Sequence, residues 1–102
     1  MEYASETCDH AKNLVQGDRH RQHGDKEENH QNIASLWSAY LELNVSPHDV
    51  AVLFALAKIG RTKAGCYNPD DYRDAVGYMA IAHELKSKRE DELEYERNNN
   101  TE

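Results

Sequence analysis

The sequence predicts an all-α fold, a compact bundle of three main helices preceded by an N-terminal helix. Apolar residues recur three and four positions apart through most of the chain, which is the period of an amphipathic helix. Two segments begin with a capping residue followed by proline, Ser46-Pro47 and Asn68-Pro69, as helices commonly do. No segment shows the alternating pattern of a strand, so these features together indicate the fold class.

The first two helices lie on either side of a polar connector. A helix with a thin apolar stripe is expected over residues 4–16, followed by the connector at residues 17–26. Asp25 then caps a second helix that runs to about Leu43. The apolar side chains of that helix are spaced three and four apart and should face the core: Ile33, Leu36, Trp37, Tyr40 and Leu41.

The third helix is expected to be the central and most buried element, because residues 50–59 are almost entirely apolar. Gly60 lies inside this helix and suggests that another backbone approaches closely there. The fourth helix continues as a charged stretch over residues 86–97, which indicates a solvated helix or a partner surface. Its core-facing residues are expected to be Ala75, Val76, Met79, Ala82 and Leu85.

Length and composition limit the domain organisation and the function. The 102 residues suit one helical domain over residues 1–97, with its core at about 25–90 and a disordered tail at 98–102. A domain of this size buries a modest core, so we expect a homo-oligomer. The net charge of −7 argues against nucleic acid as a partner. Two isolated cysteines, with no signal peptide and no membrane-spanning run, predict a cytoplasmic protein that does not enter a membrane.

Four charged residues lie where the third and fourth helices are expected to meet. Lys58 and Arg61 are three apart, as are Asp71 and Asp74, so each pair shares one face of its helix. A short loop makes the two helices antiparallel neighbours, so the pairs can meet. In one interpretation they neutralise each other across the helix interface. In the other, Glu28, Asp71 and Asp74 hold Mg²⁺ while Lys58 and Arg61 bind phosphate.

Three further residues are candidates for ligand contact. The polar connector contributes Arg19 and His23, which could contact a phosphate or a nucleobase. Tyr78 could stack on a base, and packing in the core is the alternative assignment. No motif for nucleophilic catalysis and no phosphate-binding loop is present, so no catalytic residue is assigned.

An ordered set of motifs carries a resemblance to known proteins. The set comprises Gly24-Asp25, Glu28-Asn29, residues 33–41, Pro47, residues 49–51, residues 56–61, Asp71 and residues 74–78. Over about residues 17–85 the chain resembles a family of small bacteriophage and prophage proteins of unknown function. The layout is also similar to the all-α nucleoside triphosphate pyrophosphohydrolases of the MazG type. That resemblance implies acids on two helices that hold magnesium, with a bound water that attacks the phosphate chain. Glu27 and Glu28 match the first two acids of the MazG pattern, whereas Gln31 stands at the position of a third acid.

These features predict a phage-encoded protein of the host cytoplasm that handles a nucleotide or phosphate ligand. A magnesium-dependent nucleotide pyrophosphohydrolase of the MazG type is the enzymatic form of this hypothesis. Gln31, in place of an acid, favours a non-catalytic accessory protein that binds or sequesters a nucleotide signal. A third alternative is a module that inhibits a host defence protein by direct interaction, with residues 86–97 as its surface.

Overall fold

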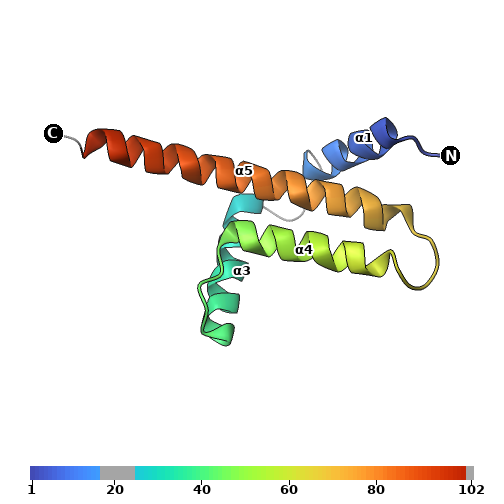
Figure 1. Ribbon diagram of the computed structural model, residues 1–102, viewed down its shortest axis with the longest axis horizontal. Helices are drawn as coiled ribbons and strands as arrows, with labels where there is room; N and C mark the ends of the chain where they lie inside the picture. Colours follow the sequence, from blue (N-terminus) through green and yellow to red (C-terminus); the bar gives the residue numbers. More distant parts are fainter. Residues whose placement is uncertain (17–24, 101–102) are drawn as a thin grey trace.

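The computed structural model describes residues 1–16 and 25–100, and the regular structure within these ranges is entirely helical. Figure 1 shows the four helices in chain order: α1 (Ala4–Val15), α3 (Lys26–Leu41), α4 (Pro47–Arg61) and α5 (Pro69–Asn99). The all-α prediction is therefore confirmed for this part of the chain. None of the described helices combines the length and the apolar character needed to cross a bilayer.

Side-chain caps begin three of the helices where the sequence predicts them. The Asp25 carboxylate accepts a hydrogen bond from the backbone N–H of Glu27 at 2.9 Å. At the start of α4, the Ser46 hydroxyl accepts from the Asp49 N–H at 3.1 Å, and the Asp49 carboxylate accepts from the Ser46 N–H at 3.0 Å. This reciprocal capping box satisfies two backbone donors, and its bonds from Ser46 lower the pKa of Asp49. At the start of α5, the Asn68 side-chain oxygen accepts a hydrogen bond from the Asp70 N–H at 3.0 Å, without a reciprocal bond.

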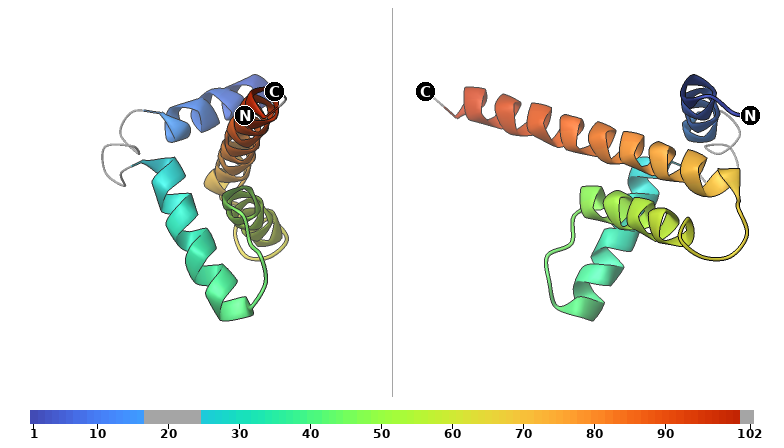
Figure 2. Two further views of the ribbon diagram at one scale, coloured as in Figure 1. Left: turned by 90° about the vertical axis from the view of Figure 1, so that its left-hand side faces the viewer. Right: turned by 45° about the vertical axis from the view of Figure 1, so that its right-hand side comes forward.

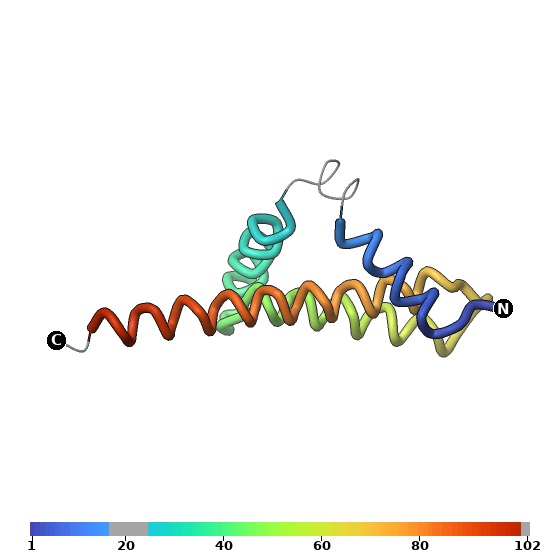
Figure 3. Tube along the Cα trace, turned by 90° about the horizontal axis from the view of Figure 1, so that it is seen from above, coloured from blue at the N-terminus to red at the C-terminus, as the bar shows by residue number. Residues whose placement is uncertain are grey.

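The helix α4 packs between α3 and α5, as expected of the central element, but its side chains Leu53, Leu56 and Ile59 are exposed, which the prediction of the most buried helix did not anticipate. It packs along α5 on one side and against α3 on another, while α1 packs on α5 (Figures 1 and 2). Seen from above in Figure 3, α1 and α3 both lie across the α4–α5 pair rather than along it. The pairing of α4 and α5 is antiparallel, because the short loop between them reverses the chain.

The buried core is small and rich in alanine. Its buried apolar residues are Ala11, Ala34, Val50, Ala51, Ala55, Ile81, Ala82 and Leu85. Five of these eight are alanines, so the helices pack closely but bury little apolar surface. Ala11 belongs to α1, so the core extends beyond the predicted range of residues 25–90. Close packing on α1 also involves Gly77, where an added Cβ would lie 3.6 Å from Val15.

An aromatic cluster around Phe54 joins α3, α4 and α5. The Phe54 ring packs edge-on against Trp37 with ring centres 5.5 Å apart, and against His30 at 6.1 Å. It also meets the ring of Tyr78, with ring centres 5.2 Å apart. Such edge and tilted contacts stabilise aromatic packing beyond simple burial, so this cluster fixes α3 onto the central pair.

The molecule is elongated, and the prediction of a compact bundle is wrong. Its radius of gyration is 16.0 Å and its extents are 58 × 32 × 24 Å. A compact domain of about 100 residues has a radius near 13 Å. The cause is α5, which continues well past the start of α4 (Figure 1).

The end of α5 corrects the predicted tail. The helix runs to Asn99, so residues 98 and 99 are helical, while residues 101 and 102 lie outside the described ranges. Ion pairs one helical turn apart, Lys86 with Glu90 and Arg89 with Glu92, support the exposed helix as far as Glu92.

Several predicted core positions are exposed instead. On α3, Leu36 is 70% exposed and Tyr40 is 87% exposed, because His30 and Ala34 face α4 in their place. On α5, Val76 and Met79 are 40% and 48% exposed. Within residues 33–41 of α3 and 75–82 of α5, apolar residues lie on most sides of the helix, so their spacing does not select the face that packs.

Gly60 and Glu42 also differ from the expected pattern. A Cβ added at Gly60 would meet no atom within 4 Å, so the close approach predicted there is absent among the described residues. Glu42 ends α3 in the left-handed conformation with φ of 55°, where glycine is the usual residue.

Candidate functional site

The four charged residues between α4 and α5 form two ion pairs. The Lys58 ammonium lies 3.0 Å from an Asp74 carboxylate oxygen, and Arg61 Nε lies 3.3 Å from Asp71 Oδ1. The order of the pairs follows from the antiparallel helices, because the last turn of α4 lies beside the first turn of α5. The interpretation in which these charges neutralise each other is therefore confirmed.

The two pairs differ in their exposure to solvent. The side chains of Lys58 and Asp74 are 24% and 17% exposed, so this pair is largely enclosed. Asp71 is buried with 7% of its side chain exposed, whereas its partner Arg61 is 63% exposed. Asp71 also borders a small polar hollow of about 190 Å³ formed by the α4–α5 loop. This second pair thus lies at the rim of the interface.

The residues predicted to bind magnesium are not brought together. Glu28 is exposed in the first turn of α3, while Asp71 and Asp74 are held on α5 by Arg61 and Lys58. Across residues 1–16 and 25–100, no group of three or more acids, histidines or cysteines is arranged to hold a metal ion. As arranged here, the set lacks the converging carboxylates that Mg²⁺ requires, and magnesium binding stays a prediction.

The structure does not place the other predicted ligand contacts beside the two ion pairs between α4 and α5. Arg19 and His23 lie outside the described residues. Tyr78 is half-buried and packs its ring against Phe54. This agrees with the alternative in which Tyr78 packs in the core and does not stack on a base. The nucleotide-binding set therefore stays a prediction, with Lys58 and Arg61 already engaged by carboxylates.

Sequence reasoning missed a second charged region where α3 meets α5. Lys88 donates a hydrogen bond to Glu27 at 3.1 Å, and this bond raises the pKa of Lys88. Lys26 lies 3.2 Å from Glu84, so two cross-helix pairs hold the start of α3 against α5. A hollow of about 220 Å³ adjoins them, lined by residues that include Glu27, Gln31, Lys86, Lys88 and Arg89. The only sequence signal for this region is charge density, which does not name partners.

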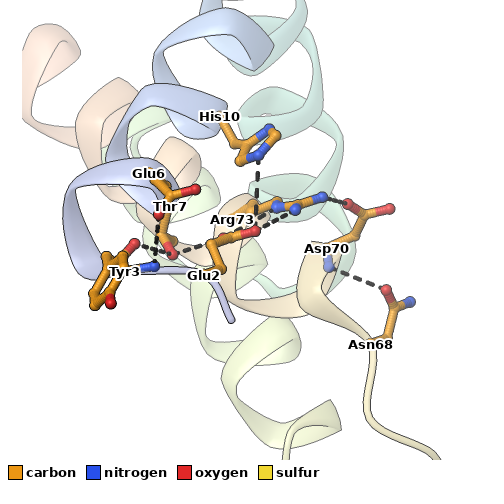
Figure 4. A network of polar contacts seen from close by, with 8 residues as sticks. All are labelled: Glu2, Tyr3, Glu6, Thr7, His10, Asn68, Asp70 and Arg73. Carbon is orange, nitrogen blue, oxygen red and sulfur yellow. Dashed lines mark hydrogen bonds and ion pairs between the residues drawn. The ribbon is translucent and has the colours of Figure 1, made fainter.

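A third polar network fixes the N-terminus of α1 on α5. As Figure 4 shows, the Glu2 carboxylate meets the Arg73 guanidinium, and it also accepts a hydrogen bond from the Thr7 hydroxyl at 2.7 Å. Arg73 in turn lies 3.2 Å from Asp70 at the start of α5. The bonds from Arg73 and Thr7 lower the pKa of Glu2 to about 2. The role of this network is structural, because the charges of Glu2, Arg73 and Asp70 pair with one another.

A further feature of the described surface is apolar and uncovered. We call it the α4–α5 apolar face and define it by six exposed side chains: Leu53, Leu56 and Ile59 on α4, and Tyr72, Val76 and Met79 on α5. The spacing of three and four residues places each set on one side of its helix. At the end nearest α1 the face sinks into a groove of about 560 Å³, lined mainly by apolar side chains such as Ile59, Tyr72 and Val76.

Together, the fold and these surfaces define a small all-helical protein with paired internal charges and an uncovered apolar face. Comparison with protein families then places it. The profile of a family described as "Domain of unknown function (DUF6378)" matches residues 6–86. The chain belongs to this family. This confirms the resemblance to a small phage family of unknown function, whereas the MazG likeness stays a prediction.

The relatives are bacteriophage proteins. The chain is 37% identical over 77 residues to the Gene 55 protein of Mycobacterium phage L5, which covers 74% of this chain and 49% of the relative. It is 41% identical over 75 residues to the Gene 55 protein of Mycobacterium phage D29, with 74% and 50% covered. The chain thus spans about half the length of the curated relatives it matches. No solved structure matches it significantly.

Proposed function

We propose that this protein is a non-catalytic phage accessory protein that acts by binding another protein. The observation that carries the proposal is the state of the charges between α4 and α5. Lys58 and Arg61, which would neutralise phosphate in an enzyme, are occupied by Asp74 and Asp71. A ligand there would have to break two ion pairs, one of them largely enclosed. Recognition by an exposed surface requires no such rearrangement.

The binding surface we propose is the α5 extension, which we define as residues 86–99. All of its residues are exposed except Leu93, which is partly buried. It carries four basic residues (Lys86, Lys88, Arg89 and Arg97) and five acidic ones (Glu90, Asp91, Glu92, Glu94 and Glu96). Tyr95 is 71% exposed among these charges. An exposed helix with one aromatic residue among mixed charges suits a protein groove with complementary charges.

Cross-linking and affinity capture from host cells test this assignment. The full chain is compared with a chain that ends at Arg89, which keeps the Lys88–Glu27 contact. We expect one host or phage protein to be captured by the full chain and lost with the truncated chain. Tyr95→Ala should reduce its recovery about tenfold or more, whereas Tyr40→Ala, at a still more exposed tyrosine on α3, should not. Equal recovery with the truncated and full chains would refute the proposal.

One observation favours nucleotide or phosphate handling as a second candidate. Glu27 and Gln31, at positions that the MazG resemblance assigns to metal binding, line the hollow beside Lys86, Lys88 and Arg89. Its volume of about 220 Å³ suits a phosphate group rather than a whole nucleotide. Incubation with a panel of nucleoside triphosphates and Mg²⁺ tests turnover, and thermal unfolding with the same panel tests binding. Neither pyrophosphate release nor a shift in Tm for any nucleotide would remove this candidate.

A further inference from the structure

We propose that two copies of this chain associate through the α4–α5 apolar face to form a symmetric homodimer. The proposal concerns residues other than the α5 extension, so it stands independently of the proposed function. It rests on the area and the charge of the face, on its shape, and on the small core beneath it. The occupant of the face is a second copy of the chain.

The area of the face is sufficient for a specific dimer. Each of its six side chains is between 40% and 55% exposed. With about 200 Å² as the full surface of a large side chain, this exposure leaves on the order of 500 Å² on each copy. Two copies would bury on the order of 1,000 Å² before the rim is counted, which reaches the lower limit for a specific interface.

The charge distribution allows two like copies to meet at this face. The chain has a net charge of −7, so two copies repel each other over most of their surface. Residues 50–57 of α4 and 75–82 of α5 contain no Asp, Glu, Lys or Arg. These two uncharged stretches lie on the paired helices that form the face. It is therefore a surface on which another copy meets little repulsion at short range.

The face combines a groove with exposed apolar side chains beside it, so two copies of it can interlock. At one end the groove of about 560 Å³ lies beside Ile59, Tyr72 and Val76. One helical turn away, Leu56 and Met79 stand out from the same side of α4 and α5. A two-fold axis between groove and ridge places the ridge of each copy in the groove of the other, which is the arrangement of an isologous interface.

Gly60 on α4 is a further feature that fits a partner helix at this face. It lies four residues after Leu56, hence on the same side of the helix. Gly60 is the last residue but one of α4, and glycine is a poorer helix former than alanine; among the described residues no neighbouring atom lies within 4 Å of its Cβ position. A partner helix that packs against this side of α4 accounts for a small residue at this position.

The small core favours a second copy of the chain as the partner of this face, because the single chain buries little apolar surface. Among the residues that the structure describes, the buried apolar ones larger than alanine are Val50, Ile81 and Leu85. Within residues 1–16 and 25–100, fourteen large apolar residues are exposed, including all six of the face. A second copy is present wherever the chain is made, so association supplies burial that the single chain lacks.

Sedimentation equilibrium and light scattering test the dimer with a matched pair of variants. Leu56→Glu places a carboxylate in the face, and we expect its dimer dissociation constant to rise at least tenfold. Leu36→Glu makes the same change at a leucine that is 70% exposed on α3, outside the face, and should leave the dimer intact. Circular dichroism checks that both variants remain helical, and Met79→Lys repeats the test from α5. The chain ending at Arg89 should remain dimeric.

The native cysteines give a readout that needs no substitution. Both are free and exposed, but Cys8 lines the groove whereas Cys66 lies in the α4–α5 loop and borders a different hollow. We expect alkylation of Cys8 to slow relative to Cys66 as the protein concentration rises. A wild-type chain that sediments as a monomer at about 100 µM would overturn the proposal, as would equal weakening by Leu56→Glu and Leu36→Glu.

Discussion

Removal of the Lys58 charge tests how the interface between α4 and α5 is stabilised. In Lys58→Met the aliphatic stem is largely kept, while Asp74 loses the ammonium group that lies 3.0 Å from its carboxylate. Breaking a fully buried pair costs about 3–5 kcal/mol, whereas an exposed pair contributes about 0–1 kcal/mol. Since these side chains are 24% and 17% exposed, we expect a loss of about 2 kcal/mol in the free energy of unfolding.

The double variant separates this effect from a general loss of packing. In Lys58→Met with Asp74→Leu, both charges are replaced by apolar groups of similar volume. Such replacements are close to neutral, so the double variant should lie within about 1 kcal/mol of wild type. The comparison therefore measures the cost of leaving one carboxylate unpaired.

Thermal and urea unfolding, followed by circular dichroism at one fixed protein concentration, provide the measurement. For a domain of this size, about 2 kcal/mol corresponds to a fall in Tm of about 8–16 °C. A single variant as stable as wild type, or a double variant as unstable as the single one, would refute the reasoning. Magnesium tests the other interpretation of Asp74. A rise in Tm with Mg²⁺ in Lys58→Met, but not in wild type, would show that the freed carboxylate accepts a metal.

Three further predictions concern the helix ends. Glu2→Gln should lower Tm most above about pH 5 and should have no effect near pH 2. The reason is that the pKa of Glu2 is lowered from 4.5 to about 2 in the folded protein, so the stabilisation by the ionised carboxylate is lost as pH falls between these values. Measurement of Tm against pH checks this prediction. Ser46→Ala should cost about 1 kcal/mol in urea unfolding, since it removes the cap of α4. Glu42→Gly should stabilise by about 1 kcal/mol in the same assay, because the φ of 55° suits glycine.

The starts of the helices could be predicted because their signals are local. Asp25, Ser46 and Asn68 each accept a hydrogen bond from a backbone N–H two or three residues later, a contact that depends only on neighbouring residues. The ion pairs between α4 and α5 could also be predicted from the sequence. A short loop dictates antiparallel helices, and the three-residue spacing then brings Lys58 to Asp74 and Arg61 to Asp71.

The buried faces could not be predicted, because they depend on which helices meet. Residues 75–82 of α5 are apolar on nearly every side, so their pattern does not distinguish Ile81, which is buried, from Met79, which is 48% exposed. The contact of Lys88 with Glu27 joins residues 61 positions apart in the chain. Its existence follows from the angle at which α3 crosses α5, and no local pattern encodes that angle.

The length of α5 has a mechanical consequence. It is one uninterrupted helix of 31 residues, with no proline after its first position. Since each residue advances the helix by about 1.5 Å, Tyr95 lies about 36 Å along the axis from Asp71, with no joint between them. Inserting one alanine before Tyr95 would lengthen this rod by only about 1.5 Å but would turn its tip by about 100°. The number of residues in α5 therefore determines the direction in which Tyr95 faces more strictly than it determines the distance of Tyr95 from Asp71.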